Sequence, residues 1–152
     1  MLKRLTPTDW LIWLHLASYG AAFLILAIFA LSYATRTQFM PYHADAVARP
    51  WHSLDSSLQL LLLALIRLVG WGWLAIVCAG LVMLHQFVVL QLPLQFLVLL
   101  QAFCLLAVTP IIAVSSEVKR RTNASPPVMA GWLSLTLTWL GFLFGLMARA
   151  AG

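Results

Sequence analysis

Residues 58–85 read LQLLLLALIRLVGWGWLAIVCAGLVMLH, and Arg67 is the only formally charged side chain in this run. A helix that crosses the hydrocarbon layer of a bilayer needs about 20 consecutive, mostly apolar residues. The run is longer than that, so it predicts a membrane-spanning helix. It also raises the question of what an arginine does inside such a helix.

Three further runs meet the same criterion, at about residues 10–33, 93–114 and 128–149. The chain is 63% hydrophobic and only 9% charged, whereas a soluble domain carries about 25% charged residues. We therefore predict an all-α, polytopic membrane protein. Its residues 1–152 form a single domain, a bundle of four transmembrane helices.

Four spans place both termini and the second connection on one side of the membrane, here called side A. The first and third connections then lie on the other side, called side B. Residues 34–57 are predicted to form a long loop between the first two spans that caps side B. Loops of this length in small domains are usually functional or partly structured, and we expect this one to be structured. At its end, Ser56 and Gln59 fit a capping box that starts the second span.

The basic residues lie at the ends of the predicted spans rather than on one polar face. This distribution is typical of contacts with lipid headgroups and argues against a nucleic-acid partner, despite the net charge of +5. Side B carries more of them (Arg36, Arg49 and residues 119–121) than side A (Lys3, Arg4 and Arg149). The total count favours side B as cytoplasmic, the first span alone favours side A, and both orientations stay open.

Arg67 has two readings. Its long stem can snorkel, so that the guanidinium reaches the headgroups. Alternatively, it faces inward and binds a carboxylate, a carbonyl or an anionic ligand, as charged groups within membranes commonly do. The acids on side B are Asp45, Asp55 and Glu117, and these are the candidate carboxylate partners.

Two glycines and two tryptophans alternate directly after Arg67, as Gly70, Trp71, Gly72 and Trp73. Residues at i and i+2 lie on nearly opposite faces of a helix. Glycine permits close approach of a neighbouring helix. The stretch therefore predicts either packing within the bundle or the wall of a cavity that holds a ring or an isoprenoid tail.

The histidines form two groups. His15 and His85 lie in the side A halves of the first two spans, where two histidines from neighbouring helices could hold a haem or simply form a polar pair. His43 and His52 lie in the first connection. With Asp45 they match no established metal spacing, so we expect them to help fold this loop.

Two features of the last two spans predict helix contacts. Gln101 lies in the middle of the third span, and a buried amide in lipid needs a hydrogen-bond partner on another helix. Gly141 and Gly145 form a GxxxG pattern in the fourth span. This pattern indicates close packing inside the bundle.

Short motifs resemble those of a group of bacterial four-helix integral membrane proteins that have no agreed activity and are similar in plan to the DoxX-like families. The motifs are residues 39–44 (FMPYHA), Trp51 and Leu54, residues 64–67 (ALIR) with Gly70 and Gly72, and residues 124–127 (ASPP). The resemblance implies a multi-pass protein of the bacterial inner membrane. A weaker likeness, carried by His15 and residues 42–44 (YHA), is to the bacterial membrane-bound protoporphyrinogen oxidase. The spacing between these two elements is longer here.

The favoured functional prediction is a small, non-catalytic inner-membrane protein. It binds a lipid- or quinone-like molecule, or serves as an accessory subunit of a membrane complex, with membrane lipids and other membrane subunits as its partners. The predicted ligand-binding residues are Arg67 for a polar headgroup, Trp71 and Trp73 for the apolar part, and Tyr42, His43 and His52 as a cover. The alternative is a membrane oxidoreductase that uses haem or quinone, with His15 and His85 as haem ligands.

Overall fold

The computed structural model describes residues 7–151, and the side chains from Asp9 onward; Lys3 and Arg4 lie outside this part of the chain. The described chain is helical, without strands. Its elements are α1 (Pro7–Ala34), α2 (Pro41–Val47), the 3-10 turn η1 (Trp51–Ser53), α3 (Ser56–Val89), α4 (Leu94–Arg121) and α5 (Val128–Ala151).

Four helices are long and apolar enough to cross a membrane: α1, α3, α4 and α5. The prediction of an all-helical chain with four apolar spans is therefore confirmed. The segment between α1 and α3, which the sequence predicts as a loop, contains the short helix α2 and the turn η1.

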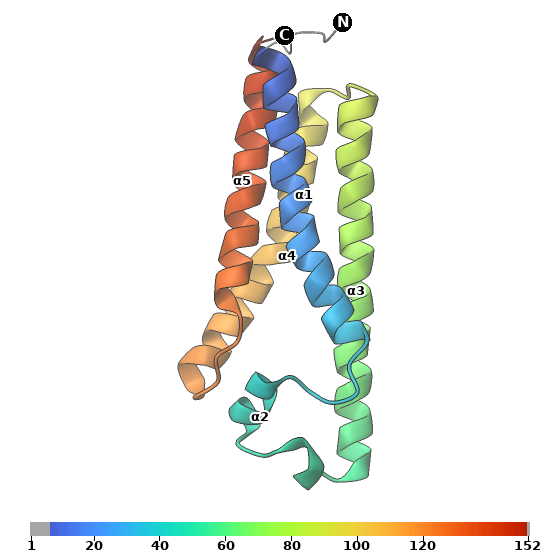
Figure 1. Ribbon diagram of the computed structural model, residues 1–152, viewed down its shortest axis with the longest axis vertical. Helices are drawn as coiled ribbons and strands as arrows, with labels where there is room; N and C mark the ends of the chain where they lie inside the picture. The colour runs from blue at the N-terminus through green and yellow to red at the C-terminus, as the bar shows by residue number, and fades with distance from the viewer. Residues whose placement is uncertain (1–6, 152) are drawn as a thin grey trace, which may run out of the picture.

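Helix α1 is the centre of the arrangement (Figure 1). It packs against α5 and α3, and α4 packs mainly against α5, with a smaller contact to α3. Both ends of the described chain lie at the same end of the bundle, which is side A. Towards side B, α1 and α3 diverge from α4 and α5, and α2 lies beneath the opening (Figure 1).

Glycines allow the helices to pack this closely. A Cβ atom at Gly141 would lie 2.5 Å from the Tyr19 ring, and one at Gly145 would lie 2.8 Å from the Nδ1 atom of His15. Gly80 on α3 faces Phe23 in the same way. The predicted packing role of the GxxxG pattern is confirmed, because both glycines receive side chains of α1.

The first turn of α3 differs from the prediction. Asp55 is the N-cap, and its carboxylate accepts hydrogen bonds from the backbone N–H groups of Ser57 and Leu58 at 2.9 and 3.0 Å. The prediction of Ser56 as the cap is wrong by one residue, because the Asp55 carboxylate already serves the amides of this turn. The Gln59 side chain instead donates to the carbonyls of Trp51 and Leu54, at 2.9 and 3.0 Å.

Helix α4 extends beyond its apolar part. The apolar run at about residues 93–114 is only part of a longer helix, which passes Pro110 and continues to Arg121. Its last turns are polar, and the Glu117 carboxylate pairs with Arg120 at 2.5 Å and also with Arg121. Ion pairs at i+3 and i+4 stabilise a helix, and basic groups near its C-terminus interact favourably with the helix dipole.

Candidate functional site

A cavity of about 350 Å³ lies in the side B half of the bundle, where the helices diverge. All four long helices and α2 contribute to its wall. Most of the wall is apolar, and its main apolar side chains are Ile25, Leu26, Phe29, Val69, Trp73 and Ile111. Ligand pockets in proteins commonly combine such walls with a few polar groups.

Two tyrosines lie at the side B end of this cavity. Both Tyr33 of α1 and Tyr42 of α2 line it, and their hydroxyl groups hydrogen-bond to each other. Burial raises the pKa of Tyr42 above its usual range, and the hydrogen bond with Tyr33 raises the pKa further. The Tyr42 hydroxyl therefore remains protonated at neutral pH and can donate, either to Tyr33 or to a bound molecule.

A third hydroxyl group lies deeper in the cavity wall. Ser134 of α5 lines the cavity and is fully buried. Its Oγ atom has no hydrogen-bond partner among the described residues. Buried polar atoms are nearly always satisfied in folded proteins, so this hydroxyl is suited to bond a polar atom of a bound molecule.

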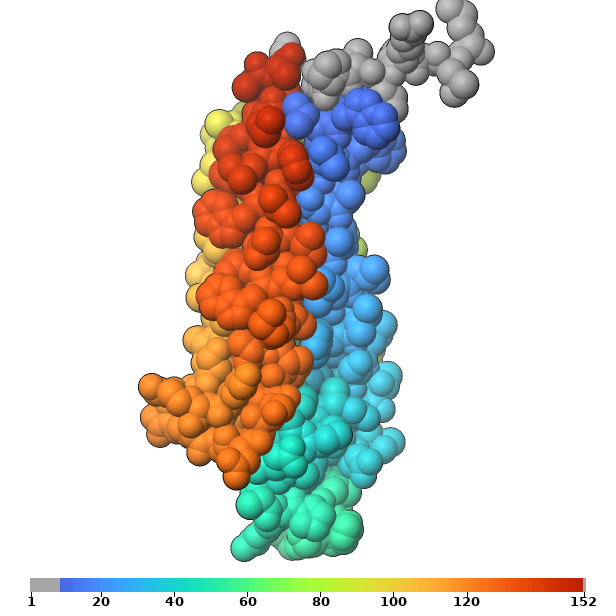
Figure 2. Space-filling model, turned by 60° about the vertical axis from the view of Figure 1, so that its left-hand side comes forward, coloured from blue at the N-terminus to red at the C-terminus, as the bar shows by residue number. Residues whose placement is uncertain are grey.

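An aromatic cluster holds α2 against the bundle. The His43 ring lies 4.5 Å from Tyr42, 6.0 Å from Tyr33 and 6.2 Å from Phe39, measured between ring centroids. Phe39 also contacts Trp51 of η1 edge-on at 4.9 Å. Backbone contacts between α2 and the long helices are sparse. The position of Tyr42 at the cavity therefore depends on these side chains. Figure 2 shows the segment that contains α2 lying against the lower ends of α1 and α5.

The protonation state of His43 matters for this cluster. Its Nδ1 atom accepts a hydrogen bond from the backbone N–H of Met40 at 3.3 Å, which requires an unprotonated Nδ1. Burial lowers the pKa of His43, and the positive charge of Arg36 lowers the pKa further. The neutral ring is thus the form that stabilises the start of α2.

Acidification is therefore expected to loosen α2. Because the folded pKa of His43 lies below its usual value of about 6.5, its stabilising contribution is present above that pH and is lost as the pH falls through the folded pKa. Hydrogen exchange of the α2 amides, corrected for intrinsic rates, should show weaker protection at about pH 5 than at about pH 7. The variant His43→Gln should lose this pH dependence and His52→Gln should keep it; equal protection of the wild type at both pH values would contradict the account.

Of the six predicted ligand-binding residues, the structure brings two to the cavity, Trp73 and Tyr42. His43 does not line the cavity but contacts the Tyr42 ring. The other three, Arg67, Trp71 and His52, are exposed and do not line the cavity. The two tryptophans point in different directions, as their spacing predicts, and only Trp73 faces inward.

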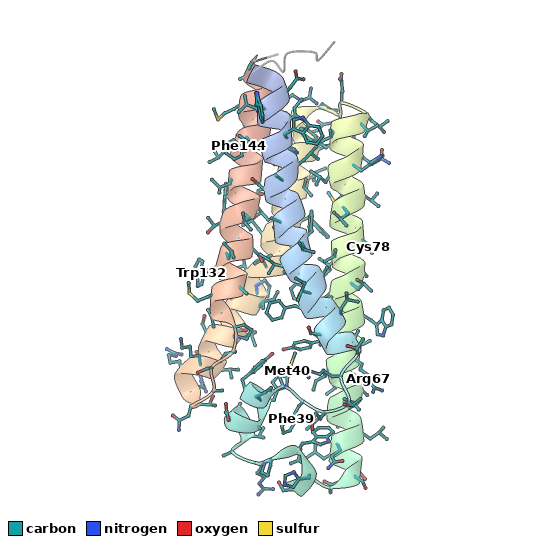
Figure 3. The ribbon with its side chains drawn as sticks, in the orientation of Figure 1. Phe39, Met40, Arg67, Cys78, Trp132 and Phe144 are labelled. Atoms are coloured by element: carbon teal, nitrogen blue, oxygen red, sulfur yellow. The ribbon has the colours of Figure 1, made fainter. Side chains whose placement is uncertain are left out.

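Arg67 bonds to the backbone where the chain leaves α1. Its Nε atom donates to the Arg36 carbonyl at 2.9 Å. Figure 3 shows Arg67 towards the side B end of the bundle, where Phe39 and Met40 are also labelled. Two of the three acids proposed as its partners are engaged elsewhere, since Asp55 caps α3 and Glu117 pairs with the end of α4. The third, Asp45, forms no ion pair with Arg67 among the described residues. The predicted partners of Arg67 were a carboxylate, a carbonyl or an anionic ligand. The partner that the structure shows is a carbonyl.

Replacing Arg67 by leucine is expected to cost about 0.5–1 kcal/mol of stability, because one exposed hydrogen bond to a carbonyl is lost. The exposed Arg49 provides a control, and Arg49→Leu should be neutral. Thermal unfolding of both variants in detergent measures the difference. Both variants should retain any bound molecule equally. Loss of that molecule from Arg67→Leu alone would show that Arg67 binds its headgroup after all.

The two proposed haem ligands do not share a pocket. His15 is buried, and its Nδ1 atom lies 2.8 Å from the Gly141 carbonyl. His85 is exposed on α3 and is not among the residues around the cavity beside His15. No group of three or more metal-ligating side chains occurs in the described part of the chain.

The sequence interpretation missed Tyr33 and Ser134. Tyr33 ends the first apolar run, and Ser134 shares one face of the last span with Thr138, Gly141 and Gly145, which are also buried. A serine that lies on the same helix face as glycines of a packing motif can therefore be predicted to have a buried hydroxyl.

No protein-family model, curated protein or solved structure matches the chain. The fold by itself defines the class, which is a multi-pass membrane protein with four candidate spans.

Proposed function

We propose that this protein binds an amphiphilic molecule, lipid-like or quinone-like, in the side B cavity, as a non-catalytic component of a bacterial inner membrane. The observation that carries the proposal is the cavity of about 350 Å³, which combines an apolar wall with the hydroxyls of Tyr33, Tyr42 and Ser134. In this role Tyr42 covers the ligand, Trp73 packs on its apolar part, and His43 positions Tyr42.

The chemistry of the wall favours a ligand with a carbonyl or ester oxygen joined to a chain. The Tyr33 and Tyr42 hydroxyls bond to each other, so only one of their two protons is used and the other is free for a ligand oxygen. The Ser134 hydroxyl is unpartnered. An acyl or isoprenoid chain fits against Phe29 and Ile111, which are apolar and line the same cavity.

The size of the cavity limits how much of the ligand it holds. Ligand pockets typically measure about 300–1,000 Å³, and this cavity lies near the lower end of that range. It therefore accepts a ring or the polar end of a lipid with the first part of its chain, and the rest of the chain extends into the bilayer.

Filling the cavity tests the proposal. Ala130 of α5 lines the cavity, whereas Ala113 of α4 is exposed and does not line it. Native mass spectrometry of detergent-solubilised protein should show a bound amphiphile on the wild type and on Ala113→Phe, and none on Ala130→Phe. The same adduct on both variants, with unchanged melting temperatures, would place the molecule outside this cavity.

A further inference from the structure

A second cavity lies at the opposite end of the bundle, on side A. It measures about 380 Å³ and is formed by the first turns of α1, the last turns of α3 and α5, and the connection that follows α3. The residues that matter for its chemistry are Ile12, His15, Phe87, Gln91, Gly145 and Arg149. None of these residues lines the side B cavity.

The hydrogen bond of His15 determines what this side chain offers to a ligand. Its Nδ1 atom lies 2.8 Å from the Gly141 carbonyl, and a carbonyl oxygen can only accept. The proton of the neutral ring must therefore be on Nδ1, which leaves Nε2 as an acceptor. This Nε2 atom is buried and has no partner among the described residues.

The ring of His15 is fixed in this orientation. A Cβ atom at Gly145 would lie 2.8 Å from Nδ1, so the ring packs directly on the α5 backbone. The rings of Tyr19 and Phe87 hold it from other sides, at centroid distances of 5.2 and 5.4 Å. His15 thus presents an oriented acceptor whose bonding capacity is unused within the described chain.

A positive charge lies beside the same cavity. The Arg149 guanidinium lies over the Phe87 ring, 5.3 Å from its centroid, and donates to the Leu92 carbonyl. A guanidinium carries five N–H donors, so others remain for an anion. Because Arg149 is exposed near the end of α5, it lies where lipid headgroups meet the helix ends.

We propose that the side A cavity binds the headgroup of an anionic phospholipid that carries a hydroxyl group, such as a phosphoglycerol headgroup. Arg149 meets the phosphate, His15 Nε2 accepts the hydrogen bond of the hydroxyl, and Ile12 and Phe87 contact the start of the acyl chain. A buried acceptor beside a positive charge distinguishes such a lipid from zwitterionic lipids and from anionic lipids without a hydroxyl. This site is separate from the proposed side B cavity.

Lipid competition on the intact protein tests the site. In native mass spectrometry after exposure to mixed micelles, the wild type should retain phosphatidylglycerol about tenfold better than phosphatidylethanol, which has the same charge but no headgroup hydroxyl. Both should be retained better than phosphatidylcholine. Equal retention of phosphatidylglycerol and phosphatidylethanol by the wild type would overturn the role of His15 without any variant.

Variants separate the two contacts. Arg149→Gln should reduce both anionic lipids to the level of phosphatidylcholine, and His15→Phe should reduce phosphatidylglycerol to the level of phosphatidylethanol. Arg121→Gln, an exposed cation on side B, is the matched control and should change neither preference. A loss of preference in Arg121→Gln equal to that in Arg149→Gln would overturn the site in favour of general charge attraction.

Two further arms complete the test. Free glycerol phosphate should leave the bound lipid in place, and its displacement of the lipid would contradict a lipid site. Ala130→Phe should keep the preference for phosphatidylglycerol, because it fills only the side B cavity. Loss of the preference in Ala130→Phe would contradict a separate side A site.

Discussion

Replacing Gly70 by leucine is expected to separate α1 from α3 and to destabilise the bundle by about 3 kcal/mol or more. A Cβ atom at Gly70 would lie 2.3 Å from the Ala34 nitrogen and 2.8 Å from the Ala30 carbonyl oxygen. These atoms belong to the α1 backbone, so no side chain can rotate away. Unfolding by SDS titration of the protein in mixed micelles measures the loss.

The neighbouring Gly72 provides a matched control. It is exposed, and a Cβ atom there would meet no other atom within 4 Å. The variant Gly72→Leu should be neutral or more stable by up to about 1 kcal/mol, since leucine favours a helix more than glycine does. Equal stability of the two variants would show that α1 and α3 do not pack through Gly70.

Removing the Gln101 amide is expected to destabilise the core by about 1–3 kcal/mol, the cost of an unsatisfied buried polar group. Tyr19 is fully buried, and its hydroxyl donates to Gln101 Oε1 at 2.8 Å. In Gln101→Leu the Tyr19 hydroxyl loses this partner within an apolar bundle. In Tyr19→Phe the Gln101 Oε1 atom loses its partner, beside an Nε2 atom that has none among the described residues.

A double-mutant cycle measures this interaction. Because the double variant Tyr19→Phe with Gln101→Leu leaves neither group unsatisfied, it should be more stable than the sum of the single losses predicts. Unfolding free energies of the four proteins in the same detergent supply the cycle. Additive losses would mean that the two side chains do not bond to each other.

Much of the fold follows from hydropathy and from a few local rules. The four apolar runs predicted the four long helices, the amide of Gln101 predicted a bond to another helix, and the GxxxG pattern predicted close packing at Gly141 and Gly145. The end of α4 was not predicted, because hydropathy falls after residue 114. The turns beyond it are stabilised by the Glu117 ion pairs instead.

The candidate site was predicted only in part, because it depends on which helix faces meet. Their spacing predicted that Trp71 and Trp73 lie on different faces of α3, but it did not predict which of them faces inward. Gly70 decides this: it packs on the α1 backbone, and Trp73, three residues later, lies on the same side of the helix. Trp71 points outward, as do Cys78 and Trp132 (Figure 3).

The partner of Arg67 was also not predictable from local sequence patterns. The sequence showed that an arginine lies within an apolar run, and a carbonyl was among its predicted partners. The Arg36 carbonyl was not identifiable, because it belongs to the backbone at the end of another helix. The cavity itself arises because the helices diverge towards side B, and no local sequence pattern predicts this divergence.

Photolabelling in bilayers that contain a diazirine-bearing phospholipid tests most directly whether the side B cavity holds an amphiphile. Leu106 and Met129 are each 78% exposed and should be labelled by bulk lipid in every variant. Phe29 and Ile111 line the cavity, and we expect label on them in the wild type and much less in Ala130→Phe. Label confined to the outward-facing residues, or unchanged on Phe29 and Ile111 in Ala130→Phe, would contradict a ligand in this cavity.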